Sequence, residues 1–232
     1  MEALPLKGLN GFRRSPSASP STEGTWQAAR VFLEDFIVAQ FGYLVLAAFA
    51  TQASAQSAPP AAEIKVAKVD FAGEGCPAST PGTASISQDG AAVAIGTPVF
   101  AARLDGAKRL VRSACSVTLE VNHPIGWQLK PDVYELTTES SLVDGVKGDM
   151  SVVAHYQGEP ENANARKDVV GVLPKTSHQL PFTEQWSRCA GKSHTTIVLS
   201  AALKVVAGKP AATGHLSALS GQTLHLAWRK CP

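Results

Sequence analysis

Residues 116–122 read S-V-T-L-E-V-N, and this stretch decides the fold class. Successive side chains of an extended chain point to opposite faces, so Val117, Leu119 and Val121 share an apolar face. No window has a sustained helical spacing, whereas residues 159–167 are polar and predict an exposed loop. The pattern predicts an all-β fold, an antiparallel β-sandwich or jelly-roll-like arrangement. The same period of two recurs at residues 64–71, 91–102, 134–142, 151–156, 169–173, 195–206 and 223–228.

The C-terminal end of the chain predicts a hairpin. Pairing Leu216 with Leu224 keeps the apolar faces of two strands together and leaves residues 219–221 as the connection. A three-residue loop that ends in glycine is a common hairpin connection. This register places His215 opposite His225 on the outer face of the sheet.

The N-terminal region predicts export. Residues 36–50 form an apolar stretch of about fifteen residues, which suits a signal peptide and is shorter than the roughly 20 residues of a membrane span. Ala53-Ser54-Ala55 is a cleavage site of the A-x-A kind, so we expect secretion with cleavage after Ala55. The alternative is an anchoring helix that stays attached. The expected division is a leader and signal-peptide helix at 1–55 with an unusually long polar start, a short linker and first strand at 56–68, and a secreted domain without a membrane span at 69–232.

Charge excludes two classes of partner. The formal net charge of the chain is only +2 at pH 7, and no block of Lys and Arg follows the leader. A protein that binds nucleic acid or an anionic membrane through its charge needs such a basic patch. The sequence therefore predicts neither partner.

Four cysteines follow the leader, and an even number of cysteines in an exported chain predicts disulfides. Three pairings of the four are open. We favour Cys76–Cys115 and Cys189–Cys231, because the second bond joins two W-x-x-C phrases and lets a tryptophan cover the bridge. A zinc site is the competing interpretation. It prefers closely spaced cysteine pairs, and these cysteines lie tens of residues apart.

The phrases around the cysteines carry a family resemblance. In chain order they are F-A-G-E-G-C-P at 71–77, R-S-A-C at 112–115, H-P-I-G-W at 123–127, W-S-R-C at 186–189 and L-A-W-R-K-C at 226–231. With them the chain resembles the family known as domain of unknown function 4360, small secreted proteins of fungi and bacteria. It departs from that family's pattern at Ala190, which separates Cys189 from Gly191. The resemblance implies a secreted, disulfide-bonded β-rich domain without an assigned biochemical role, and it supplies no catalytic residues.

Histidines are the candidate metal ligands. His215 and His225, if they are opposite each other, could hold a metal ion, with His194 on a neighbouring strand as a third ligand. Two imidazoles across a hairpin are more often a solvent-facing pair, and no H-x-H, H-x-x-x-H or H-E-x-x-H motif supports a metal site. We therefore expect no cofactor.

Carboxylates and aromatic side chains are the remaining candidates. Hydrolysis of a glycan would need two convergent carboxylates, and Glu120, Glu135, Glu139 and Asp144 are available, although solvated charges are the default interpretation. No G-x-S-x-G motif occurs, and Gly191-Lys192-Ser193 lacks the first glycine of a phosphate-binding loop. Because the tryptophans beside the cysteines are expected in the core, Trp127 and Tyr134 are left as the candidate ligand surface.

The sequence thus favours a binding protein over an enzyme. The leading hypothesis is a secreted, disulfide-stabilised, non-enzymatic module that binds an extracellular ligand, such as a glycan or another cell-wall component. The alternatives are an extracellular glycan or ester hydrolase and a histidine-based metal-binding protein. The catalytic residues of a hydrolase are unknown from the sequence.

Overall fold

The computed structural model describes residues 58–189 and 191–232. The expected leader and signal-peptide helix lie outside these residues. One short 3-10 helix, Ala61–Glu63, precedes eleven β-strands. Within the described part of the chain, no helix has the length and apolarity to cross a membrane.

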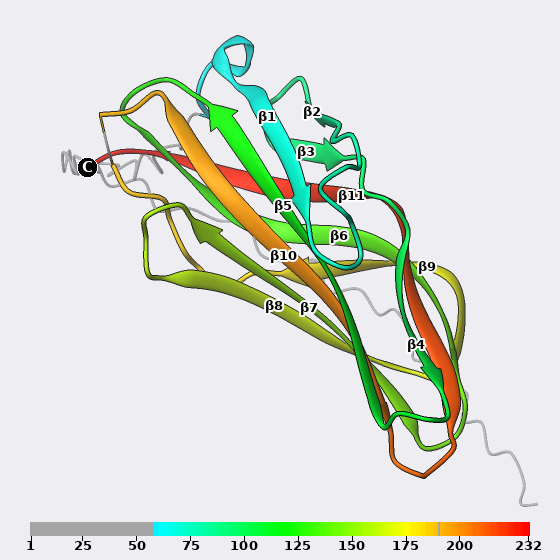
Figure 1. Cartoon of the computed structure of the whole chain (residues 1–232). Coiled ribbons are helices and arrows are strands. Elements are labelled where there is room, and N and C mark those ends of the chain that lie inside the picture. Colours follow the sequence, from blue (N-terminus) through cyan, green and yellow to red (C-terminus); the bar gives the residue numbers. More distant parts are fainter. Residues whose placement is uncertain (1–57, 190) are drawn as a thin grey trace, which may run out of the picture. The chain divides into compact units, whose positions relative to one another are not determined.

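The strands form two antiparallel sheets that face each other, as Figure 1 shows. The all-β sandwich expected from the alternating pattern is therefore confirmed. The first sheet has the order β1-β5-β10-β7-β8. Its strands are β1 (Lys65–Ala72), β5 (Leu110–Asn122), β10 (His194–Ala207), β7 (Val146–Tyr156) and β8 (Asn162–Val170).

The second sheet has the order β2-β3-β11-β6-β9, and β4 also pairs with β11. Its two long strands, β11 and β6, lie side by side and carry the short strands at their edges. The strands are β2 (Ala84–Ile86), β3 (Ala92–Ile95), β11 (Thr213–Lys230), β6 (Trp127–Leu142), β9 (Val172–Pro181) and β4 (Phe100–Asp105).

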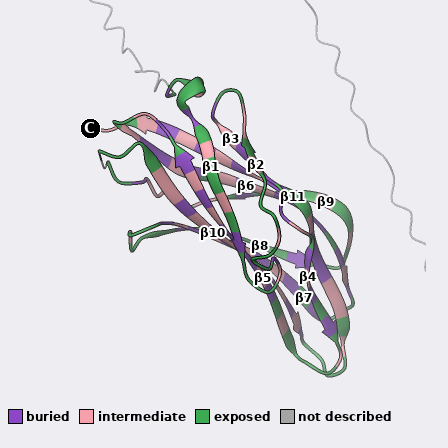
Figure 2. Ribbon diagram, turned by 45° about the horizontal axis from the view of Figure 1, so that its top comes forward, coloured by how far each residue is buried: buried purple, intermediate pink, exposed green. Residues whose placement is uncertain are grey.

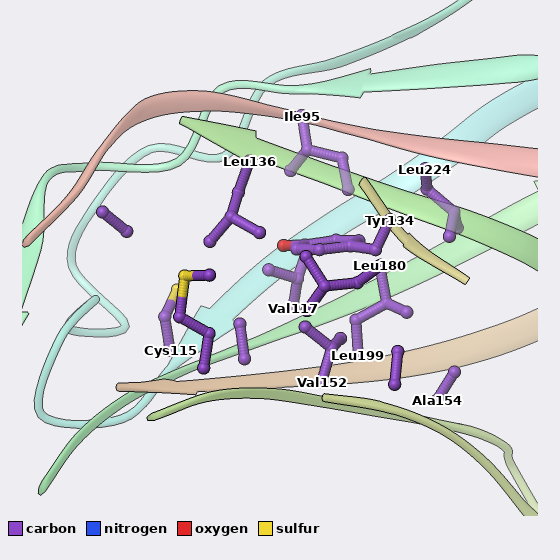
Figure 3. Packing of buried hydrophobic residues seen from close by; sticks show 14 of the residues in the cluster. Ile95, Cys115, Val117, Tyr134, Leu136, Val152, Ala154, Leu180, Leu199 and Leu224 are labelled. Carbon is purple, nitrogen blue, oxygen red and sulfur yellow. The ribbon is translucent and has the colours of Figure 1, made fainter. Parts of the chain in front are cut away.

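Alternating side chains fill the space between the sheets. Along β5, for example, Val117, Leu119 and Val121 are at most 1% exposed, as the pattern of residues 116–122 predicts. Figure 2 shows the same alternation of buried and less buried residues along the other strands. Figure 3 shows Tyr134 of β6 in the interior beside Val117 and Leu180, which come from opposite sheets.

Two disulfides close the sandwich. Cys76 bonds to Cys115 and Cys189 bonds to Cys231, the two pairs favoured from the sequence. The first bond joins the segment after β1 to β5, and both of its cysteines are fully buried. The second bond joins the connection between β9 and β10 to the residue after β11.

The prediction of a C-terminal hairpin is wrong. β11 runs without a turn from Thr213 to Lys230, and residues 219–221 form an irregularity between Ala218 and Gln222. Residues 213–218 pair with β4 and residues 222–225 pair with β3. The irregularity thus lies where β11 changes neighbours, and the backbone N–H of Gly221 donates to the carbonyl of Thr97 in the link between β3 and β4.

Four other local predictions need correction. Residues 159–167 include the start of β8, an edge strand whose small Ala163 and Ala165 are buried between polar residues. Residues 169–173 are a hairpin between β8 and β9, because Gly171 has a φ of 74°. Residues 91–102 divide into β3 and β4. β1 also continues across the expected division after residue 68.

Candidate functional site: a polar cleft at one end of the sandwich

A cleft of about 530 Å³ opens where β7 ends and β10 begins. Three segments line it: residues 156–159 at the end of β7 and in the following turn, residues 187–188 in the connection before β10, and residues 192 and 194–196 just before and at the start of β10. The lining is polar and carries both signs of charge. Ligand-binding sites are usually concave, and convergent polar groups in them fix the orientation of the ligand.

One wall of the cleft is fixed at Ser187, which is 2% exposed. Its backbone N–H donates to the carbonyl of Leu129 at 2.9 Å, and the N–H of Leu129 donates to the Ser187 hydroxyl at 3.1 Å. The amide of Gln128 donates to the Ser187 carbonyl. Two residues further on, the disulfide of Cys189 fastens the same segment to Cys231. This wall is therefore held by the edge of β6 and by a covalent bond.

Glu159 connects the two walls. Its own N–H donates to the carbonyl of Tyr156 at 3.0 Å, which closes the turn after β7. Its Oε1 accepts the backbone N–H of Arg188 from the opposite wall, also at 3.0 Å. The carboxylate thus bridges the turn and the connection, and it shapes the cleft before any ligand arrives.

Tyr156 forms the floor of the cleft and is only 3% exposed. Its hydroxyl lies 2.8 Å from the carbonyl of Leu129 and 3.0 Å from that of Gln185. Burial, with a smaller effect of the Glu159 charge, raises the pKa of this phenol far above its usual value. The hydroxyl therefore stays protonated and holds β6 and the β9–β10 connection together.

Basic side chains line the open part of the cleft. Arg188, Lys192 and His194 are exposed there. No ion pair found among residues 58–189 and 191–232 includes Arg188 or Lys192. Thr195, the next residue of β10, bonds through its hydroxyl to Nε2 of the buried His123 at 2.8 Å. Thr195 thus anchors the start of β10, while Lys192 and His194 stay open to solvent.

Tryptophans and further cations lie beside this cleft. The guanidinium of Arg229 lies 4.2 Å from the centre of the Trp186 ring, and the Lys130 ammonium lies 5.6 Å from it. Lys230 similarly lies 5.7 Å from the Trp127 ring. Cations over indole faces are electrostatically favourable. Half-buried Trp186 therefore belongs to the surface at this end and not to the core, unlike the buried Trp228.

Tyr134 is not a surface residue, which corrects the prediction for it. It is 0% exposed, and its hydroxyl donates to Oε1 of Gln222 inside the core. Alternation along β6 places it on the inner face, opposite Leu224 of β11. Trp127 at the start of β6 is half-buried and stays a candidate contact at the same end as the cleft.

The three candidate metal ligands do not come together. His215 and His225 lie ten positions apart on β11, roughly 30 Å at the usual rise of an extended strand. His215 pairs with Ser141 and His225 with Val133, so the two rings are not opposite each other. His194 belongs to the other sheet, where it pairs with Asn122. Among the described residues, no group of three or more His, Cys, Asp or Glu side chains could hold a metal ion.

The candidate carboxylates are also dispersed. Glu135 and Glu139 lie four positions apart on β6, about 13 Å along the strand, which exceeds the separation of a glycosidase pair. Glu120 lies on β5 in the other sheet, and Asp144 forms an exposed ion pair with Lys209.

One group of side chains has the composition of a catalytic triad. The Ser177 hydroxyl donates to Oε1 of Glu135 at 2.9 Å, and Nε2 of His225 lies 3.6 Å from Oε2 of the same carboxylate. The carboxylate thus separates the serine from the histidine. A nucleophilic serine needs the histidine as its direct partner, so this order does not activate the hydroxyl.

Of the residues that line the cleft, sequence reasoning singled out His194, as a candidate metal ligand, and missed the charged residues beside it. Glu159 fell in a segment interpreted as a plain loop, Lys192 in a rejected phosphate-loop motif, and Arg188 inside a W-x-x-C phrase. The useful signal was the disulfide itself, because it predicts that the segment around Cys189 is held at the end of β11. Nothing in the local pattern indicates that the turn after β7 faces that segment.

The fold and the cleft define a disulfide-bonded β-sandwich with a polar cleft at one end. The chain belongs to the family described as "Domain of unknown function (DUF4360)", whose model matches residues 62–231. The comparison with curated proteins gave no match.

Two similar solved structures are carbohydrate-binding modules. One is TmCBM61 in complex with β-1,4-galactotriose, with 11% identity, coverage of 72% of this chain and 90% of that chain, and a TM-score of 0.24. The other is TmCBM27, described for specific mannan recognition, with 9% identity, coverage of 72% and 98%, and a TM-score of 0.28. At TM-scores this low, the two alignments carry no argument about the ligand of this chain.

Proposed function

We propose that this chain is an extracellular, non-enzymatic binding module that takes a glycan into the cleft between the turn after β7 and the connection before β10. The observation that carries the proposal is the preformed wall at Ser187, which hydrogen bonds and a disulfide hold in place. A site that is rigid before binding loses less conformational entropy when the ligand arrives. A surface loop without a binding role does not need to be held by these hydrogen bonds and a disulfide.

The lining of the cleft supports a hydroxyl-rich ligand. Glu159 offers a carboxylate oxygen as an acceptor, and Arg188 and Lys192 offer donors. Thr196 adds a hydroxyl that can donate or accept. Sugar hydroxyls also do both, and each polar group of the cleft therefore has a natural partner in a glycan. Trp127 at the same end of the sandwich is a candidate stacking surface for a neighbouring sugar.

Two disulfides support an extracellular location, because disulfides persist in oxidising compartments. We propose that the leader is removed after Ala55 and that the mature chain begins at Gln56. N-terminal sequencing of protein recovered from the medium of a secretory host checks this. A start upstream of residue 50 would contradict the assignment.

The binding proposal is tested by titrating the secreted protein against a panel of cell-wall glycans, with calorimetry and NMR shifts as readouts. We expect at least one glycan to bind. Thr196→Trp should abolish this binding, because the indole fills the cleft. Thr118→Trp is the matched control, since Thr118 is a half-buried threonine on the neighbouring strand β5 outside the cleft.

Two results would contradict the proposal. The absence of binding to the whole panel would remove the glycan as ligand, and equal binding by the Thr196→Trp variant would remove the cleft as its site. Turnover of a panel member would show that the cleft is an active site.

A further inference from the structure

We infer that the glycan held in this cleft is acidic, with a carboxylate substituent bound by Arg188 and Lys192. The inference rests on the proposed function and names the ligand class for the same site. It rests on three features of the cleft. Arg188 and Lys192 come from different segments, they have no ion pair within the described part of the chain, and the Glu159 carboxylate accepts a hydrogen bond from the main chain.

The two cations come from different segments. Arg188 belongs to the wall fastened at Ser187 and Cys189, and Lys192 belongs to the approach to β10. His194 follows on the same side. Like charges that converge on one concave surface raise the local positive potential, and low-dielectric walls focus it. A bound anion removes this repulsion, so the cleft favours a negatively charged group.

Arg166, a cation elsewhere on the first sheet, has carboxylate partners within the chain. On the outer face of that sheet, Arg166 of β8 donates to Asp149 of β7 and lies 3.6 Å from Asp168. These three residues line a hollow on that face, and the hollow therefore already contains carboxylates that balance the Arg166 charge. Arg188 and Lys192 have no such ion pair within the described part of the chain. Their donors therefore remain available to a ligand.

Glu159 does not neutralise the cleft in the same way. Its Oε1 is occupied by the backbone N–H of Arg188, so the carboxylate bonds to the main chain and not to the guanidinium. The planar guanidinium stays free to bind a carboxylate through two parallel N–H groups. Oε2 of Glu159 is left to accept a sugar hydroxyl. The site thus separates an anion-binding side from a hydroxyl-binding side.

The test compares two ligands that differ in charge and in three small methyl groups. Trigalacturonate carries three carboxylates, and its trimethyl ester keeps the same sugars, linkages and hydroxyls without the charge. We expect the secreted protein to bind the acid at least about tenfold more tightly than the ester, and raising the salt concentration should weaken binding of the acid only.

Variants assign the effect to the two cations. Lys192→Gln and Arg188→Gln should each weaken binding of the acid by about threefold to tenfold and leave binding of the ester unchanged. Arg112→Gln is the matched control, because Arg112 is an exposed arginine of β5 outside the cleft. Thermal unfolding of each variant verifies the fold. Lys192→Glu reverses the charge at an exposed position and should weaken binding of the acid more than Lys192→Gln does.

The outcomes separate the inference from the proposed function. Equal binding of acid and ester, or preference for neutral glycans of the panel with loss in Thr196→Trp, would overturn the acidic ligand and leave the binding module intact. Acid binding that is unchanged by both glutamine variants would overturn the assigned contacts. Failure of every acidic and neutral glycan would remove both.

Discussion

Tyr134 lies in the core of the sandwich, with its ring edge-on to Phe182 at a centroid distance of 6.4 Å. Its hydroxyl is one of few polar groups there and donates to Gln222 of β11. The Gln222 amide nitrogen is buried without a partner among the described residues. Tyrosine and glutamine therefore depend on each other, and burial raises the pKa of the phenol so that it remains a donor.

Removing the Tyr134 hydroxyl should destabilise the protein. Tyr134→Phe leaves the buried amide of Gln222 with no partner for its oxygen, and we expect a loss of about 1–3 kcal/mol in the free energy of unfolding. In the double variant Tyr134→Phe/Gln222→Leu both polar groups are absent, so its stability should recover toward the wild type. Urea unfolding measures both. A single variant as stable as the wild type would contradict the dependence.

His178 of β9 is a second buried polar residue, 4% exposed. Its Nε2 lies 2.9 Å from the Thr138 hydroxyl, and its Nδ1 has no partner among the described residues. Burial, with a smaller effect of the Lys167 charge, lowers the pKa of His178 below its usual 6.5. Burial likewise lowers the pKa of His123, whose ring packs against Trp228.

These shifts predict that acid weakens the fold. Because the folded pKa values lie below the unfolded ones, the unfolded state binds more protons and the free energy of unfolding rises with pH. The contribution is complete above about pH 6.5 and is lost as the pH falls below it. His178→Gln should give a shallower slope between pH 7 and 5 in urea unfolding, and similar stability at pH 8 is the internal control. Parallel curves for the two proteins would contradict this origin.

Strand β11 shows how an element is shaped by its neighbours. Apolar and polar residues alternate along the sequence on both sides of residues 219–221, and this pattern is typical of the two strands of a hairpin. The strand instead continues, because β3 ends at Ile95 and β4 begins at Phe100 beside this point of β11. Gly221 has a φ of 80°, a conformation that other residues adopt only at a cost.

Substitutions at Gly221 test this backbone requirement. A Cβ there would meet nothing within 4 Å, so any loss comes from the dihedral angle alone. We expect Gly221→Ala to lower the free energy of unfolding by about 1–2 kcal/mol and Gly221→Asn to lower it less, since asparagine tolerates this region better. Gly191→Ala is the control, because Gly191 has open space and no positive φ. Equal stability of all three variants would contradict the requirement.

At the scale of the whole molecule, the two disulfides have different environments. Cys76 and Cys115 are 0% exposed, whereas Cys189 is exposed. Thiol–disulfide exchange needs access of the attacking thiolate to sulfur. The bond that fastens the cleft is therefore the more accessible of the two.

Mild reduction should open Cys189–Cys231 first. Alkylation followed by mass mapping should label these two cysteines before Cys76 and Cys115. Removing the bond by Cys189→Ser/Cys231→Ser should lower the free energy of unfolding by up to about 4 kcal/mol, the chain-entropy value for a loop of this size. Removing this bond should also weaken the binding of any ligand in the cleft. Simultaneous labelling of all four cysteines in the folded protein would contradict the difference in access.

Local patterns were enough for much of this protein. The alternation in residues 116–122 predicts which side chains face the core, since the geometry of an extended chain imposes a period of two. The cysteine phrases predict the family and the bonded pairs. Both kinds of information lie within a few residues of sequence or in the spacing of a few marked positions.

The tertiary structure decided the partners of each strand and hence the site. Alternation says that Tyr134 and Glu135 face opposite ways, but not which face is buried or which strand lies beside them. The cleft joins residues 156–159 to residues 187–188 and 194–196, and Arg188 meets Glu159 only because β7 ends where the bonded segment before β10 returns. Such contacts depend on long-range pairing of strands, which a local pattern does not encode.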